Sequence, residues 1–175
     1  PSPRASQVPQ VGSYYDPGVM SELMKAVESI PAYIERASHF FVLCPTVQHL
    51  NLRDVLCSYG TWQGRGWCRV EQIALLLARH SELPAIVVKG GDAAPFMVSP
   101  AASLSHTPGT GQFTCCSRGH VVTDDAGSEV SIPCDKAKIG PMAFRMLEAK
   151  REYALMFEGP ASYRIWTAYM PRLML

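Results

Sequence analysis

The 175-residue sequence lacks any large excess of charge and any long apolar run. Charged residues make up 18% of it, the formal net charge at pH 7 is +1, and the 16 Lys and Arg residues are scattered. A protein that binds nucleic acid usually gathers these residues on one face, so we expect no nucleic-acid partner. No apolar run approaches the roughly 20 residues that cross a bilayer, so we expect no membrane span.

Signals for secretion are also missing. The first ten residues, PSPRASQVPQ, are polar and interrupted by proline, which is unlike a secretory leader and predicts a flexible tail over 1–10. Six cysteines are too sparse for a secreted disulfide scaffold of this size, and Cys44 and Cys68 lie in apolar stretches where buried thiols are expected. We therefore expect a reducing, cytoplasmic environment. Because the chain begins at Pro1, we also expect a fragment of a longer protein.

Hydrophobic residues are plentiful, at 47% of the chain, which predicts a globular domain with its own core. Strands are predicted at 11–15, 39–45 and 84–91, and helices at 20–29, 31–38 and 67–80. Apart from His39 and Lys89, the runs 39–45 and 84–91 consist of apolar residues and glycine, as is typical of strands buried on both faces of a parallel sheet. The alternation of strands and helices predicts an α/β fold with a parallel sheet.

The rest of the chain is less regular. Residues 46–66 are predicted to form a long loop, and residues 92–134 an irregular, β-containing insertion. A helix is predicted to begin at Pro141. We expect the α/β domain to cover 11–158, and the apolar end at 159–175 to form a C-terminal helical extension.

The segment GRGWCRVEQ, residues 64–72, places candidate functional groups at the start of a helix. Trp67 and Glu71 are four residues apart and share one helix face. They lie near the positive end of the helix dipole, and Arg65 supplies a cation beside them. Such a carboxylate, indole and guanidinium suit a ribose-containing ligand, with the carboxylate on sugar hydroxyls or on a developing oxocarbenium charge. Acidic residues are common in first turns for dipole reasons alone, so spacing by itself favours a surface charge.

Residues 11–90 resemble the middle of a TIR domain. The segment SIPAYIERASHFFVLCP, followed by GWCRVEQIAL, is similar to a stretch of that family in which a helix, a buried strand and a variable loop precede the motif W-C-x-x-E-L. The matching residues here are Trp67, Cys68 and Glu71. The segment YYDPG at 14–18 resembles the strand and turn before the family's second helix. The Arg-Gly pair before Trp67 is most similar to the divergent TIR modules of protists.

The resemblance implies a flavodoxin-like, three-layer α/β/α fold that is incomplete at its N-terminus, since the family's first strand and helix have no counterpart before residue 11. In the TIR domains that are enzymes, the motif glutamate cleaves NAD+ at the nicotinamide–ribose bond, which makes Glu71 the candidate catalytic residue. Ligands of such sheets bind at the carboxyl ends of the strands, so Asp16, Arg65 and Trp67 are the candidate ligand-binding residues. NAD+ would be the substrate, and no cofactor or metal is expected.

Two other functions stay open from the sequence. Many TIR domains are adaptors, so the chain is alternatively a non-catalytic interaction module that associates with itself or with other TIR-like domains. A structural subunit of a larger assembly is the third alternative, suggested by the apolar C-terminal end and its aromatic residues at helical spacing. The enzyme needs Glu71 directed into an open pocket, whereas the adaptor tolerates its pairing with a surface Lys or Arg.

One cluster has metal-ligand chemistry, namely Cys115, Cys116, His120 and Cys134. Its spacing lacks the usual C-x2-C knuckle, and adjacent cysteines seldom both reach one tetrahedral ion. The sequence therefore favours packed thiols over a metal site at these positions.

Overall fold

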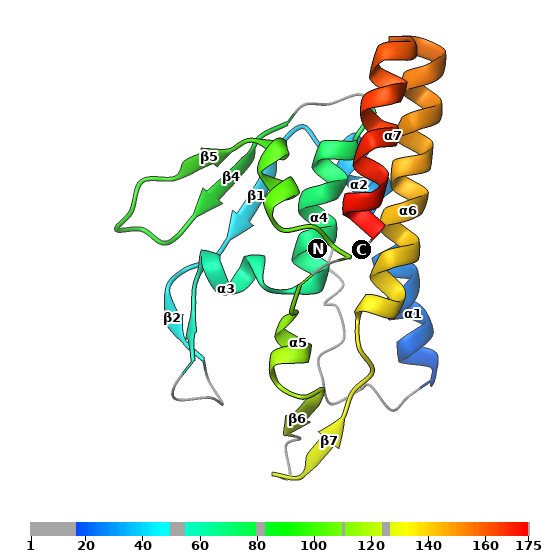
Figure 1. The fold of residues 1–175 in the computed structure, drawn as a ribbon. Coiled ribbons are helices and arrows are strands. Elements are labelled where there is room, and N and C mark those ends of the chain that lie inside the picture. The colour runs from blue at the N-terminus through cyan, green and yellow to red at the C-terminus, as the bar shows by residue number, and fades with distance from the viewer. Residues whose placement is uncertain (1–16, 50–54, 80–82, 110, 124–126, 175) are drawn as a thin grey trace, which may run out of the picture.

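The computed structural model describes residues 17–49, 55–79, 83–109, 111–123 and 127–174 (Figure 1). The predicted tail, the predicted strand at 11–15 and the candidate ligand residue Asp16 lie outside these ranges. Within them the chain has a mixed α/β fold, which confirms the predicted class at that level. No helix in these ranges is both long enough and apolar enough to span a membrane.

Helix α4 (Gly66–Leu77) lies at the centre of the fold, between the sheet and the C-terminal helices (Figure 1). It contributes to all three core clusters: Leu75 packs towards the sheet, Val70 towards Phe113, and Ile73 towards the C-terminal helices. A helix that is apolar nearly all round must be covered on all sides. The predicted helix at 67–80 is thus confirmed, although it ends earlier, at Leu77.

A three-stranded sheet forms one side of the fold, in the order β1-β4-β5 (Figure 1). β1 (Phe40–Leu43) and β4 (Ala85–Val88) pair in parallel, which confirms both predicted apolar strands and their direction. β5 (Phe96–Val98) pairs antiparallel with β4 and comes from the segment predicted to be irregular. The sheet is therefore mixed.

Among the described residues, helices cover one face of the sheet. Val42 and Val87 are buried against α4 and α2 (Ile30–Arg36), which lie on the same side of the sheet (Figure 1). On the opposite face Phe41 is 55% exposed, Leu43 72% and Met97 74%. The prediction that both faces of these strands are buried is wrong, because the helices that pack on the sheet share one side of it.

The N-terminal half contains four more short elements: α1 (Pro17–Glu28), β2 (Val47–Gln48), β3 (Leu56–Cys57) and α3 (Tyr59–Gln63). α1 begins inside the predicted turn, because proline suits the first position of a helix. β2, β3 and α3 lie within 46–66, so the prediction of one long loop there is wrong for the described part. Ser58 caps α3, its hydroxyl accepting from the Thr61 amide while the Thr61 hydroxyl accepts from the Ser58 amide.

The insertion contains η2 (Pro100–Ser105), α5 (Thr114–Ser117) and a hairpin of β6 (Val121–Thr123) and β7 (Glu129–Ser131). The antiparallel pairing of β6 with β7 confirms the β content predicted there. Phe113, just before α5, is 1% exposed and anchors this part of the chain to the core.

The chain ends in two long helices that lie side by side (Figure 1). α6 (Lys136–Tyr153) continues through the π-helical turn η3 (Ala154–Glu158), and α7 (Pro160–Met174) returns along it. The prediction that α6 begins at Pro141 is wrong. Pro141 lies inside the helix, where its lack of an amide hydrogen removes one hydrogen bond. Because this position is near the start of the helix, the loss of stability is smaller than it would be in the middle. Trp166 of α7 packs against the core cluster of Ile73, Leu77 and Leu147.

Candidate functional site

The predicted segment Arg65–Glu71 forms the start of α4. Arg65 precedes the helix with an extended backbone and an exposed side chain. Gly66 is buried, and a Cβ atom there would lie 2.6 Å from Cδ1 of Ile139. Glycine therefore lets the start of α4 approach the core closely. Trp67 and Glu71 follow one turn apart, and both are half-buried.

The half-buried Glu71 carboxyl is partly shielded from water. Burial raises its pKa, and the charge of Arg65 partly opposes this shift. Within the described part of the chain, no group donates a hydrogen bond to this carboxyl or forms an ion pair with it. Shielded carboxyls usually have such a donor, and carboxyls with perturbed pKa values gather at functional sites. Glu71 is thus more buried than a fully exposed surface charge, and its catalytic role stays a prediction.

Trp67 links this face of α4 to Asp135, the residue before α6. The Trp67 indole donates a hydrogen bond to the Asp135 carboxylate. Burial raises the pKa of Asp135, whereas that hydrogen bond and nearby positive charges, including Arg65, lower it. The structure therefore brings together two shielded carboxyls, one indole and one arginine whose charge acts on both carboxyls.

Two residues of this region escaped the sequence reasoning. Asp135 has a weak sequence signal, since an acidic residue at a helix start is common. Arg69 has none, because it lies within an apolar helix. Its side chain is nonetheless buried: Nε donates to the Gln63 carbonyl at 2.9 Å, and the guanidinium lies 5.0 Å from the centre of the Phe113 ring. Arg69 ties the start of α4 to its surroundings.

An open groove of about 530 Å³ runs between α2, α4 and α6. On the α4 side it is lined by Ala74 and Leu77 of the helix and by Ala78 directly after it, and Glu71 is not among its lining residues. Trp67, Glu71, Ala74 and Ala78 are spaced by four, three and four residues, so they lie on one stripe of the helix. Glu71 therefore lies one helical turn from the nearest α4 residue of the groove and outside its lining.

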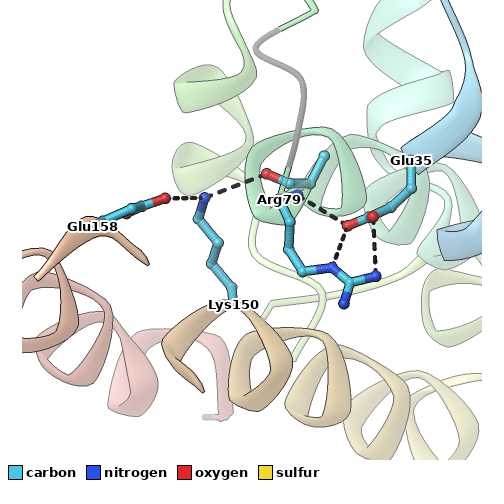
Figure 2. Close-up of polar contacts among 5 residues, drawn as sticks. Glu35, Arg79, Lys150 and Glu158 are labelled. Atoms are coloured by element: carbon cyan, nitrogen blue, oxygen red, sulfur yellow. Dashed lines mark hydrogen bonds and ion pairs between the residues drawn. The ribbon is translucent and has the colours of Figure 1, made fainter. Parts of the chain in front are cut away.

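Charged side chains hold the far end of α4 beside this groove (Figure 2). Arg79 donates to both oxygens of Glu35 on α2, at 3.0 and 3.1 Å. Lys150 of α6 is 7% exposed and donates to Glu158 at 3.0 Å and to the Ala78 carbonyl at 3.4 Å. A cation is favourable at the carboxyl end of a helix. These contacts hold α4 against α2 and α6 and so maintain the walls of the groove.

The structure also brings together Cys115, Cys116, His120 and Cys134. One potential ligand atom from each lies within 4.8 Å of the others. The Sγ atoms of Cys116 and Cys134 are 3.7 Å apart, and all the cysteines are free thiols. The adjacent Cys115 and Cys116 thus both belong to one cluster despite their spacing, and the absence of a metal stays a prediction. Cys44 and Cys68 are buried as predicted, and burial raises the pKa of Cys68 to about 12.

No family model, curated protein or solved structure matches this chain. The resemblance to TIR domains therefore rests on the motif around Trp67 and on the order of elements.

Proposed function

We propose that the chain is a TIR-like module that binds NAD+ and cleaves its nicotinamide–ribose bond, with Glu71 as the catalytic carboxylate. The observation that carries the proposal is the Glu71 carboxyl itself: shielded, raised in pKa, and without a donor among the described residues. A carboxyl group held in this state is stabilised when a ligand supplies the missing donor or a positive charge.

The reaction breaks one bond and forms one cation that the protein has to stabilise. The bond between the ribose C1′ atom and the nicotinamide nitrogen breaks, and nicotinamide leaves as a neutral molecule with the electron pair. The ribosyl group becomes an oxocarbenium ion, which water then attacks with loss of a proton. The ionised Glu71 carboxylate stabilises that cation, and its low-dielectric surroundings strengthen the interaction.

The neighbouring groups have roles that follow from their positions. Trp67 presents an indole held by Asp135, a rigid surface against which a ribose or a planar ring packs. Arg65 is exposed beside Glu71 and suits a phosphate oxygen. The groove that begins one turn along α4 has room for the remainder of the nucleotide.

The test is nicotinamide release from NAD+ by the purified chain, at several protein concentrations because sites in this family are often completed by assembly. Glu71→Ala and Glu71→Gln should lower the rate by about 10²- to 10³-fold. Glu152→Gln, which removes an exposed carboxyl on α6, is the matched control and should leave the rate unchanged. A folded chain that releases no nicotinamide at any concentration contradicts the proposal.

The pH profile adds a second criterion. Stabilisation of the cation needs an ionised carboxylate, so activity should fall as the pH drops through the raised pKa of Glu71. The acid limb of the profile should therefore lie above the ordinary pKa of a glutamate. An acid limb at the ordinary value would assign the activity to another carboxyl.

A non-catalytic interaction module is the second candidate function. The observation that favours it is the outer face of the sheet, formed by the exposed side chains of Phe41, Leu43 and Met97. Contiguous exposed apolar residues mark interaction surfaces. The two functions are separated by variants that lose association but keep nicotinamide release, or that lose nicotinamide release but keep association.

A further inference from the structure

Four metal-ligating side chains converge beside the start of α4, and the Glu71 proposal uses none of them. Cys115 and Cys116 lie on α5, His120 follows it, and Cys134 lies between β7 and α6. All four potential ligand atoms lie within 4.8 Å of one another. In a tetrahedral zinc site the sulfur atoms are about 3.8 Å apart, given a zinc–sulfur distance of about 2.3 Å. The 3.7 Å between Sγ of Cys116 and Sγ of Cys134 matches this spacing.

The backbone after α5 reverses so that the ligands meet. Gly119 and His120 both have positive φ, at 60° and 59°. His120 is the only non-glycine residue in the described chain with positive φ, a conformation that costs of order 1 kcal/mol. The reversed chain is held by the His120 amide, which donates to the Cys115 carbonyl at 2.9 Å. The amide of Ile132 in turn donates to the His120 carbonyl at 2.8 Å, which brings Cys134 towards α5.

The His120 ring carries an independent sign of a missing partner. Its Nε2 atom is buried and has no hydrogen-bond partner within the described chain. A buried imidazole nitrogen without a partner is unfavourable unless something else occupies its lone pair. An ion bound through Nε2 would satisfy that nitrogen.

Charged side chains lie close to individual ligands of such a site. A zinc ion with three thiolates and one imidazole carries a net charge of −1. The positive charge of Arg69 interacts with Cys116, and Asp135 interacts with His120. Histidine ligands of zinc commonly have a carboxylate nearby that orients the ring.

We propose that Cys115, Cys116, His120 and Cys134 bind one zinc ion that holds the 113–135 segment to the start of α6. Three sulfur ligands and one nitrogen favour zinc, and four protein ligands leave no open position, which indicates a structural site. The segment needs such a link because an isolated two-stranded hairpin is at best marginally stable. Trp67, Cys115 and Cys116 all pack against the same buried cluster around Val70 and Phe113, so the ion would also support the core beneath the residues around Glu71.

The first test is the zinc content of the untagged full chain after purification under reducing conditions without chelator. We expect one zinc per chain in the wild type and in Cys57→Ser, which removes a half-buried cysteine outside the cluster. We expect Cys134→Ser to lose zinc affinity by more than the roughly 10- to 100-fold typical of residues that only support a ligand. Equal zinc in Cys134→Ser and Cys57→Ser would overturn the proposal.

A second measurement does not depend on how the variants fold. Cobalt(II) added to the reduced, metal-free wild-type chain should give visible d–d bands of a tetrahedral site and a near-ultraviolet thiolate charge-transfer band. Added zinc should displace both signals. Absence of these bands from a chain that keeps its helical circular dichroism would overturn the proposal, as would a Cys116–Cys134 disulfide found under these reducing conditions.

Discussion

At the scale of single residues, Glu71 separates a functional interpretation from a purely structural one. A carboxyl that stabilises the fold normally has a donor or a cation in contact with it, as Glu35 has in Arg79. Glu71 is more shielded from water than a surface charge, yet no described residue donates a hydrogen bond to it. Functional groups held ready for a ligand commonly lower the stability of the protein that carries them.

We therefore predict that Glu71→Gln raises the free energy of unfolding at neutral pH by on the order of 1 kcal/mol. The raised pKa means that the folded chain holds this proton more tightly than the unfolded chain does. The corresponding stability is present below the ordinary pKa of glutamate and is lost as the pH rises through the folded-state value. Urea unfolding at several pH values, beside Glu152→Gln, measures this.

The difference between wild type and Glu71→Gln should vanish in acid, where both side chains are neutral. A glutamine variant that is less stable than wild type at neutral pH would show that the carboxylate has a stabilising partner.

At the scale of elements, the start of α4 depends on the absence of a side chain. At Gly66 a Cβ atom would lie 2.6 Å from Ile139 and 2.7 Å from the Phe113 ring, distances that well-packed cores do not allow. Gly140 on α6 has nothing within 4 Å of its Cβ position. A side chain is thus excluded at Gly66 of α4 but has space at Gly140 of α6.

We predict that Gly66→Ala lowers the free energy of unfolding by about 1–3 kcal/mol, because α4 must move away from α6. Gly140→Ala should instead raise it by about 0.5–1 kcal/mol, since alanine is the better helix former. Chemical denaturation of both variants provides the comparison. If Gly66→Ala changed the free energy of unfolding in the same way as Gly140→Ala, the start of α4 would have room to shift.

At the scale of the whole molecule, the described part of the chain leaves one face of the sheet with exposed apolar side chains. Phe41 and Met97 flank Ile86 across the three strands, with Leu43 further along β1. An apolar face of this kind suits a second copy of the same chain, because a two-fold axis pairs the same surface with itself.

We predict concentration-dependent dimerisation of the wild type and its loss in the double variant Leu43→Glu, Met97→Glu. Both residues are more than 70% exposed, at 72% and 74%, so the monomer should stay folded. The matched control is Leu155→Glu, Met156→Glu, which adds the same charges at exposed apolar residues of η3. Sedimentation velocity separates the outcomes. A wild type that stays monomeric would contradict the prediction.

The sequence by itself determined the local elements of this protein. The apolar runs around Val42 and Val87 predicted β1 and β4 as a parallel pair, and the helical spacing around Ile73 predicted α4. Hydrophobic periodicity reports the local backbone and the average burial of an element, so it sufficed there. It also placed Trp67 and Glu71 on one helix face, because that relation is local to one helix.

Only the tertiary structure decided what surrounds those elements. Cys134 is 18 residues from Cys116, and two consecutive left-handed residues bring the two thiols within 3.7 Å, which no spacing rule predicts. The contact of Trp67 with Asp135 and the bare face at Leu43 likewise depend on how separate elements dock. Side-chain convergence across elements follows from turn geometry and packing, and these lie beyond the reach of periodicity along the chain.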